Sequence, residues 1–322
     1  MKLYRLKLRP LSSWMTPWQA DTLSGSLCWA AARHLGSDAL NEEILKPTLA
    51  GEPPFVLSDA FPGDLLPIPI TVKLHHWEPD VRKEVKRARW ITLEAFNLAQ
   101  RGEPPRKDGL FGEELIQPLE RIRNTISRTT DTTGDEGSLF PTQEFVLDTS
   151  SSLTKETPYL SVYVRVGEGF EERLIQLFRL LEANGFGADA SVGYGRFEVI
   201  PTLEPVDWLD VPADSINGLM TLSTFQPAQN DPTDGYWELL MKYGKVGADF
   251  GLENVFKKPL VMLKPGACFR SRPFRPYLGR AIPMSEILPK EITDELQAME
   301  INMLHYAFGL AVPFILNEGV KN

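Results

Sequence analysis

Apolar and basic residues alternate along the start of the chain, MKLYRLKLRPL. Alternation with period two is typical of a strand with one buried face, whereas a signal peptide would need a continuous apolar run. We therefore expect a strand over residues 2–8. A helix is expected from about residue 21, capped by Asp21 or Thr22. Its apolar stripe would consist of Leu23, Leu27, Ala30 and Ala31.

Three segments follow in which the periodic pattern is interrupted. FPGDLLPIPITVKL (61–74) carries prolines that argue against a helix and against a central strand. The basic run VRKEVKRAR (81–89) fits the solvated face of a helix, a structural rather than a functional role, and a short helix is expected around 94–100. Residues 119–148 are rich in Thr, Asp, Gly and Ser, and we expect them to leave the domain as a long hairpin.

The clearest periodicities lie between residues 158 and 205. PYLSVYVRV (158–166) alternates as a strand. Apolar residues from Phe170 to Leu181 then fall on one helical face, and Asn184 and Gly185 would end that helix. After a glycine-rich segment, YGRFEVIPTL supplies another strand.

Strand, helix, strand, strand, helix, strand is the element order of a ferredoxin-like domain. LEPVDWLDVPAD (203–214) carries two prolines and a cluster of acids, which indicates a boundary near residue 207. The second half offers a helix near 289–299 and strands near 217–225, 236–243, 259–264, 267–271 and 305–315. The sequence therefore predicts an α+β protein of two tandem ferredoxin-like (RRM-like) domains, 1–206 and 207–322, with a thumb-like hairpin inserted at about 119–148.

The composition adds mainly exclusions. The chain has 322 residues, of which 43% are hydrophobic and 24% charged, as in ordinary soluble proteins. Cys28 and Cys268 lie far apart and the four histidines match no ligand spacing, so no metal or other cofactor is expected. The longest apolar stretch, 306–316, is too short to span a bilayer. We expect a cytoplasmic protein with no membrane partner.

The charge is unevenly distributed along the chain. The net charge of −9 argues against a nucleic-acid partner, but residues 257–280 hold seven cations and no acid. Cations interleaved with aromatic residues suit single-stranded RNA, whose bases are free to stack; a surface that contacts a protein partner is the alternative. The residues expected to bind RNA here are Lys264, Gly266, Phe269, Arg270, Arg272 and Arg280.

The glycine-rich segment GFGADASVGYGRFEV (185–199) lies between the expected helix and strand. Glycines permit positive φ and the close approach of backbone N–H groups to an anion. A Rossmann phosphate loop needs a strand, then glycines, then a helix, so that interpretation fails on order; a turn that serves geometry alone stays open. The candidate contacts with phosphate or base are Gly185, Gly187, Ser191, Gly193, Tyr194, Gly195 and Arg196.

Three further regions offer weaker candidates for RNA contacts. The expected hairpin mixes cations with hydroxyl and amide groups, although a solvated loop with scattered arginines explains them equally well; its candidates are Arg121, Arg123, Asn124 and Arg128. The first helix offers Thr22, Ser24 and Gly25, for which a helix cap alone is the better explanation. Lys73, at the end of the proline-rich segment, is a further phosphate candidate.

Four segments, in this order, resemble one family: WQADTLSGSLCWA (18–30), IRNTISRTTDTTGDEGSLF (122–140), the glycine-rich segment and KPGACFRSRPFRPYLGR (264–280). They resemble the fourth subunits of the type III-A (Csm) CRISPR effector, within the repeat-associated RNA-binding superfamily. The resemblance implies a non-catalytic subunit that caps the 5′ handle of the guide RNA (crRNA), with 122–140 as a thumb beside the guide. It implies as partners the large polymerase/cyclase-like subunit and a backbone subunit, with target RNA met only indirectly.

An enzyme of the same superfamily is the main alternative. The related guide-processing endoribonuclease cleaves without a metal and uses a histidine near its first helix, and here His34 ends the first expected helix. His34 has no obvious lysine or tyrosine partner, and a histidine at a helix C-terminus is more often favoured by the helix dipole. Asp131 and Asp135 lie in the expected hairpin, but nothing in the sequence arranges them around a metal. We therefore expect no catalytic residue. A third alternative, two ferredoxin-like domains with a small-molecule ligand, explains neither the basic segment nor the motif order.

Overall fold

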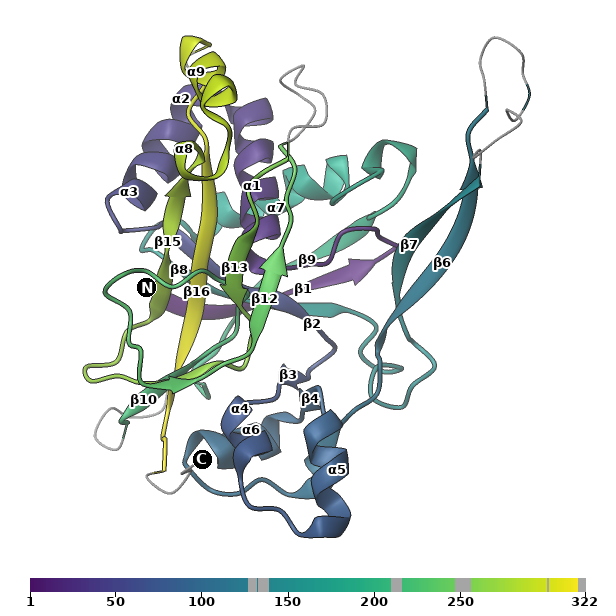
Figure 1. Cartoon of the computed structure of the whole chain (residues 1–322), viewed down its shortest axis with the longest axis vertical. Helices are drawn as coiled ribbons and strands as arrows, with labels where there is room; N and C mark the ends of the chain where they lie inside the picture. The colour runs from purple at the N-terminus through teal and green to yellow at the C-terminus, as the bar shows by residue number, and fades with distance from the viewer. Residues whose placement is uncertain (127–131, 133–138, 210–215, 247–255, 300, 318–322) are drawn as a thin grey trace.

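The computed structural model describes residues 1–126, 132, 139–209, 216–246, 256–299 and 301–317. Helices and antiparallel sheets are mixed along the chain, so the predicted α+β class is confirmed. Within these ranges, no helix is both long and apolar enough to cross a membrane. Figure 1 shows a body of packed sheets and helices, a hairpin that projects far from it, and a group of short helices beneath the sheets.

The first sheet is built from β1 (Lys2–Pro10), β2 (Phe55–Pro62), β8 (Leu160–Val166) and β9 (Phe197–Pro205). The strand order is β2-β8-β1-β9, and neighbouring strands are antiparallel. Helix α1 (Ala20–Leu35) lies between β1 and β2 in the chain, helix α7 (Glu171–Asn184) lies between β8 and β9, and the two helices pack side by side. The elements of the first half thus follow the predicted order.

The start of α1 differs from the prediction. The helix begins at Ala20, so neither Asp21 nor Thr22 caps it. The backbone N–H of Ala20 instead donates to Asp59 Oδ1 at 2.9 Å, and the same buried carboxylate accepts from the N–H and the hydroxyl of Thr224, at 2.7 and 2.6 Å. A buried acid in β2 therefore joins the start of α1 to the second half of the chain. The residues next to the helix start could not predict this contact, because Asp59 lies 39 residues further along the chain.

Short elements fill the segments on either side of β2. Before it come α2 (Ser37–Leu40), a π-helical turn (Asn41–Leu45) and α3 (Lys46–Leu49). After it come β3 (Leu66–Pro67), α4 (Ile70–Leu74), α5 (Pro79–Arg87), β4 (Trp90–Ile91), α6 (Leu93–Gln100) and β5 (Leu110–Phe111). The prediction that prolines exclude a helix from 61–74 is wrong at its end, because α4 begins directly after Pro69, where a missing N–H breaks no helical hydrogen bond.

The expected long hairpin is confirmed. Strands β6 (Ile116–Asn124) and β7 (Leu139–Leu147) pair antiparallel along their whole length. They project from the body of the molecule, as Figure 1 shows. Three residues named from the sequence, Arg128, Asp131 and Asp135, lie outside the described residues.

The second half centres on a sheet with the order β11-β14-β10-β16-β15. Its strands are β10 (Gly218–Thr221), β11 (Gly235–Tyr236), β14 (Cys268–Arg270), β15 (Tyr277–Pro283) and β16 (Leu304–Phe314). Strands β12 (Leu239–Lys242) and β13 (Leu260–Leu263) pair separately, and α8 (Met284–Ile287) and α9 (Lys290–Ala298) precede β16. β15 was not predicted. No helix occurs between β10 and β11, a stretch that the structure describes in full, so this half departs from the pattern of the first.

One hydrophobic core joins the two halves. Met220, Tyr306 and Phe314 of the second half belong to the same buried cluster as Leu6 and Phe178 of the first. Strand β16 packs against α1 and β2. The segments that surround a site can therefore come from both halves, and the boundary near residue 207 stays a prediction.

Candidate nucleic-acid interface

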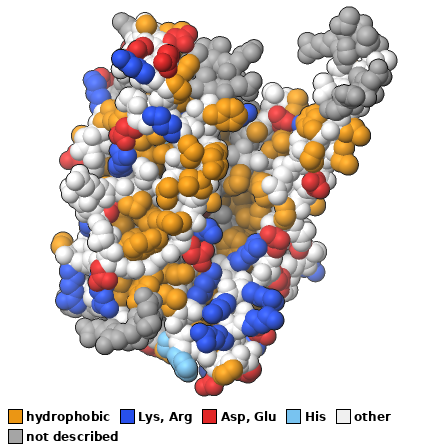
Figure 2. Space-filling view, viewed as in Figure 1, with side chains coloured by type: hydrophobic (Ala, Val, Ile, Leu, Met, Phe, Trp, Pro, Cys, Tyr) orange, Lys and Arg blue, Asp and Glu red, His pale blue; other side chains and the backbone are white. Residues whose placement is uncertain are grey.

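A basic pocket lies where the proline-rich segment, the end of α5 and the turn after β13 meet. Its volume is about 510 Å³. The described residues that line it include one acid, Glu238, and five cations: Lys73, Lys86, Arg87, Arg89 and Lys264. In Figure 2, Lys and Arg side chains gather over α5 and the segments beside it, below the hydrophobic side chains that cover β12 and β13. Such an excess of cations around one cavity suits the phosphates of a nucleic acid.

Gly266 allows two distant segments to close this pocket. Its φ is +96°, and a Cβ there would lie 2.5 Å from the carbonyl oxygen of Ile68, so a side chain would force the backbone to move. The Gly266 carbonyl accepts a hydrogen bond from the N–H of Ile70 at 2.9 Å, and the Gly266 N–H donates to the Thr221 carbonyl at 2.8 Å. These bonds hold α4 beside the turn after β13.

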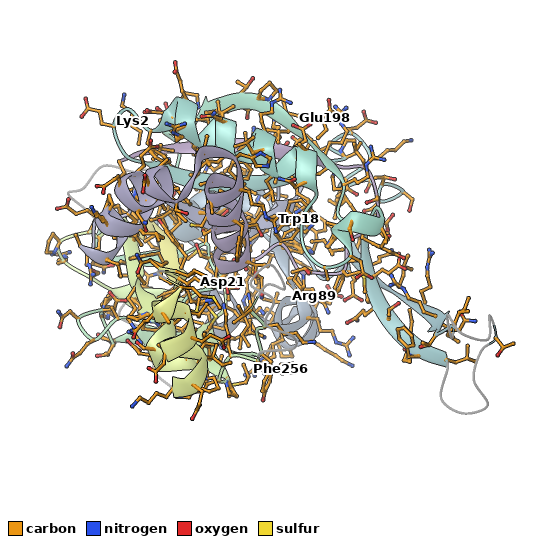
Figure 3. All side chains as sticks on the ribbon, turned by 90° about the horizontal axis from the view of Figure 1, so that it is seen from above. Lys2, Trp18, Asp21, Arg89, Glu198 and Phe256 are labelled. Carbon is orange, nitrogen blue, oxygen red and sulfur yellow. The ribbon has the colours of Figure 1, made fainter. Side chains whose placement is uncertain are left out.

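Strand pairing brings the cations of α5 to the same place. β3 pairs with β4, and the N–H of Ile68 donates to the carbonyl of Arg89 at 3.2 Å. Figure 3 labels Arg89, whose guanidinium also forms an ion pair with Glu114 at 2.7 Å. Lys86, Arg87 and Arg89 were not among the predicted site residues, because a basic run fits a solvated helix face equally well. The available signal was the absence of any acid from residues 85–92.

Glu238 lies between two of the pocket's cations. Its carboxylate is 3.3 Å from Lys73 Nζ and 3.2 Å from Lys264 Nζ. Burial raises the pKa of Glu238, but the two lysines outweigh this effect and hold the pKa below its ordinary value. Glu238 is therefore ionised at neutral pH, and its carboxylate pairs with both lysines.

The glycine-rich segment is a tight turn whose polar groups serve the protein itself. Gly195 has a φ of +61°, a Cβ there would lie 1.9 Å from the Phe186 carbonyl oxygen, and its N–H donates to Ser13 O at 2.8 Å. The other N–H groups of the turn that donate within the protein are those of Phe186, Ala188, Val192, Gly193, Tyr194 and Arg196. For these groups the prediction of a phosphate cradle is wrong. Gly185 is half-buried, while Gly187, Ser191 and the Arg196 side chain are exposed and remain candidates.

Tyr194 connects this turn to the hairpin. Its hydroxyl donates to Glu144 Oε1 at 2.9 Å, and the guanidinium of Arg123 lies 4.9 Å from the centre of its ring. Arg123 in turn forms an ion pair with Asp189 at 2.5 Å. Arg123 therefore already lies over one face of the Tyr194 ring, and stacking of this ring on RNA stays a prediction.

Glu144 is the centre of the same network. Its side chain is only 1% exposed, and it accepts from Arg121 Nε at 2.7 Å and from the Ser13 hydroxyl at 2.8 Å. Burial raises the pKa of Glu144, but the hydrogen bonds from Ser13 and Tyr194 and the charges of Arg121 and Arg123 lower it below its ordinary value. Of the predicted residues in β6, Asn124 is exposed and remains a candidate.

The cations of residues 257–280 do not form one surface. Arg270 lies on β14 and Arg280 on β15, with β10 and β16 between them, a separation of roughly 14 Å at the usual spacing of strands. Arg270 pairs with Asp234 at 3.5 Å and Arg280 with Glu286 at 2.7 Å. Arg270 and Arg280 thus each have an acid partner, one from the segment before β11 and the other from α8, directly after β15. Lys264 and Gly266 join Lys73 in the basic pocket, and Arg272 is exposed outside it.

Phe269 and Ser24 are buried. Phe269 is 3% exposed and its ring stacks on Trp237, with 5.4 Å between ring centres. Ser24 is 1% exposed on the buried face of α1. The predictions that these two residues contact RNA are therefore wrong.

The start of α1 carries a buried ionic network. Lys242 Nζ donates to the Thr22 hydroxyl at 2.7 Å and pairs with Asp21 at 2.6 Å, and His305 Nε2 lies 3.2 Å from the second oxygen of Asp21. Figure 3 shows Asp21 between α1 and the C-terminal part of the chain. The predicted contact residue Thr22 thus binds β12, and Gly25 beside it is half-buried.

His34 lies exposed at the end of α1. Its Nε2 is 3.0 Å from the Asn184 side-chain nitrogen at the end of α7, and it does not line the basic pocket. Within the ranges that the structure describes, no group of three or more His, Cys, Asp and Glu side chains could hold a metal ion.

The fold is that of a known class of protein. No protein-family model matches the chain, and neither does any curated protein. Solved structures do match: a chain of the "Csm1-Csm4 cassette in complex with pppApA" has a TM-score of 0.63 at 20% identity, over 99% of this chain and 100% of that one. A chain of the "Csm3-Csm4 subcomplex in the type III-A CRISPR-Cas interference complex" has a TM-score of 0.58 at 12% identity, over 98% and 100%.

These likenesses extend over essentially the whole chain, hairpin included. The class of fold is therefore one found in type III-A CRISPR-Cas assemblies. Within that class, the fold is that of the Csm4 subunits of type III-A complexes, as the sequence motifs predicted.

Proposed function

We propose that this chain is the subunit of a type III-A CRISPR complex that binds the 5′ handle of the guide RNA and caps its end. The observation that carries the proposal is the basic pocket, in which Lys73, Lys264 and Gly266, all predicted from the sequence to bind RNA, meet three further cations: two at the end of α5 and one, Arg89, just before β4. The Csm4-like fold supports the same assignment. In this proposal, the chain consists of two tandem ferredoxin-like domains and acts in the cytoplasm.

The proposed partners follow from the proteins that the chain resembles. The matched structures are named for assemblies of Csm4 with Csm1 and with Csm3. We propose that this chain likewise links a large polymerase/cyclase-like subunit to a backbone subunit and meets target RNA only through the guide. The side chains of Leu239, Met241 and Val261 on β12 and β13 are hydrophobic and exposed side by side, which suggests a protein contact.

The chain has no catalytic role in this proposal. The alternative, RNA cleavage by His34, has little support in the geometry, because the ring contacts Asn184 and not a lysine or tyrosine that could assist proton transfer. Purified chain and the His34→Ala variant should therefore leave a labelled guide RNA equally intact. Cleavage by the first and not by the second would overturn this part of the proposal.

The binding experiment compares two double variants of equal charge. Lys73→Ala/Lys264→Ala removes two pocket lysines, and the control Lys155→Ala/Lys290→Ala removes two exposed lysines elsewhere. Affinity for the co-purifying guide RNA is measured by filter binding over a salt series. The pocket variant should bind about tenfold or more weakly at low salt, and its salt slope should fall by about 1.4, since each lost phosphate contact removes about 0.7.

The control variant should bind as the wild type does. Equal losses in both variants would mean that RNA responds only to net charge, which contradicts the pocket. The capping role is tested separately by assembling the complex without this chain: a guide whose 5′ end is still protected from exonuclease would contradict it.

A further inference from the structure

A second pocket lies on the other side of α4 from the basic pocket. Its volume is about 540 Å³, and the described residues that line it include five aromatic side chains: His75, His76, Trp77, Tyr236 and the buried Phe314. Ile70 and Lys73 of α4 line the basic pocket, whereas Thr71, Val72 and Leu74 of the same helix line this aromatic pocket. Helix α4, about 10 Å across with its side chains, therefore lines both cavities.

One ring of the aromatic pocket, that of Trp77, is fixed by a hydrogen bond and contacts a second ring. The indole N–H of Trp77 donates to the Val72 carbonyl at 2.7 Å, which fixes the tryptophan against α4. The ring of His75 lies edge-on to Trp77, with 5.8 Å between ring centres and 83° between planes. Trp77 is half-buried and His75 is exposed, so the pair combines a fixed position with access from outside. Because the indole N–H is already used, Trp77 can offer a ligand only its ring.

Polar groups surround the rings at the rim. Arg82, Glu103 and Asn317 line the same pocket and are exposed. A guanidinium, a carboxylate and an amide together can donate to and accept from the edge of a base, and the guanidinium plane can also stack. Rings for the face of a ligand and mixed polar groups for its edge are what a nucleobase requires.

We propose that the aromatic pocket receives one base of a single-stranded RNA whose phosphate is held in the basic pocket across α4. The proposal rests on the proposed function and adds to it the position where a base is bound. It also resolves a difficulty, because two aromatic residues predicted to stack on bases, Tyr194 and Phe269, are engaged within the protein. A cation-lined cavity beside a ring-lined one is the combination that proteins use for unpaired strands.

The test is a double-mutant cycle between the RNA base and the pocket. The purified chain, or the assembled complex, is titrated with copies of its co-purifying guide RNA in which one nucleotide at a time is abasic. With wild-type protein, one position should stand out, with affinity lowered about 5- to 150-fold. With His75→Ala/Trp77→Ala, the intact RNA should bind more weakly by a similar factor, and the abasic change at that position should have no further effect.

Two further variants keep the test decisive. His75→Ala alone changes an exposed side chain and should reduce the position-specific loss even if the tryptophan variant folds poorly. Trp237→Ala removes a tryptophan that is 40% exposed outside both pockets and should leave the position-specific loss unchanged.

The outcomes separate this inference from the proposed function. RNA binding that depends on Lys73 and Lys264 but shows no base position coupled to Trp77 would overturn the base pocket and leave the proposed function standing. Failure of the wild-type protein to bind any RNA would overturn both. Loss of a partner subunit in the His75→Ala/Trp77→Ala variant, with RNA affinity unchanged, would show that the pocket holds a protein side chain instead, and would also overturn the inference.

Discussion

Cations cluster in two regions: the hairpin junction, where β6 and β7 meet the glycine-rich turn at Tyr194, and the basic pocket. The two regions differ in how many of these cations are paired with acids. At the junction, Arg121 and Arg123 meet Glu144 and Asp189, and the Tyr194 ring lies under one guanidinium. In the pocket, Glu238 is the one acid among the described lining residues, against five cations; it pairs with Lys73 and Lys264, and Arg89 pairs with Glu114 outside the pocket. The first region is a closed ionic network that fixes the hairpin to the body. The second has an excess of positive charge among its lining residues.

The difference shows that cations indicate a binding site only where acids from the rest of the chain do not reach them. The cationic run at 257–280 makes the same point, since Arg270 pairs with Asp234 and Arg280 pairs with Glu286. A paired surface cation gives little stabilisation and has little charge left for a ligand. RNA binding at the junction, or a purely structural role for the pocket, would contradict this difference between the two regions.

The largest expected effect is on the junction. Gly195→Ala places a Cβ 1.9 Å from the Phe186 carbonyl oxygen at a φ of +61°, so the turn has to move. We expect the free energy of unfolding to fall by about 3 kcal/mol or more, measured by urea denaturation. Gly193→Ala is the control: its φ is +100°, but no atom lies within 4 Å of the new Cβ, so it should cost only about 1 to 2 kcal/mol. Equal losses in the two variants would contradict the structural role of Gly195.

The next effect concerns the acid at the centre of the junction. Glu144→Gln keeps the shape but leaves the donors of Arg121, Ser13 and Tyr194 without a charged acceptor, and should lower the free energy of unfolding by about 1 to 3 kcal/mol at pH 7. The pKa of Glu144 is lowered from 4.5, so the unfolded chain binds the proton more tightly than the folded one. The stability that the carboxylate supplies is complete above about pH 5 and is lost as the pH falls through the folded value.

A measurement at two pH values separates the charge of Glu144 from its shape. Urea denaturation of wild type and Glu144→Gln at pH 7 and pH 3.5 measures the difference between them at each pH, so that the titration of other acids cancels. The difference should shrink at the lower pH. A constant difference would mean that shape, and not charge, is what Glu144 contributes.

Local sequence patterns predicted where strands and helices form better than they predicted which segments contact each other in the fold. The strand β1 and the β6–β7 hairpin follow from alternation and composition within a few residues. By contrast, β15 was missed, and nothing within 277–283 shows that this segment pairs with β16 instead of forming a loop. The α1 cap was missed for the same reason, since Asp59 comes from another strand.

The candidate site shows the same limit. Lys73, Lys264 and Gly266 were predicted because prolines, glycines and cations mark close backbone packing and anion contacts. Lys86 and Arg89 could not be separated from a solvated face, because their position depends on the pairing of β3 with β4. Phe269 was assigned to RNA because its neighbours are basic, yet strand pairing of β14 with β10 buries it. In each case the missing information is a contact between distant segments.

The smallest expected effect is a change in RNA affinity when the one acid among the described lining residues of the basic pocket, Glu238, is replaced. Glu238 is ionised at neutral pH and bridges Lys73 and Lys264, so a phosphate that binds there has to displace it or lie beside it. Glu238→Gln removes that charge, and we expect RNA affinity at low salt to rise about three- to tenfold, with the gain fading as salt screens the pocket. Glu286→Gln is the matched control, because it removes the acid partner of Arg280 at a site outside the pocket. An equal gain in both variants would mean that RNA senses only the overall charge. A loss of affinity in Glu238→Gln would mean that Glu238 positions the two lysines for the phosphate and does not compete with it.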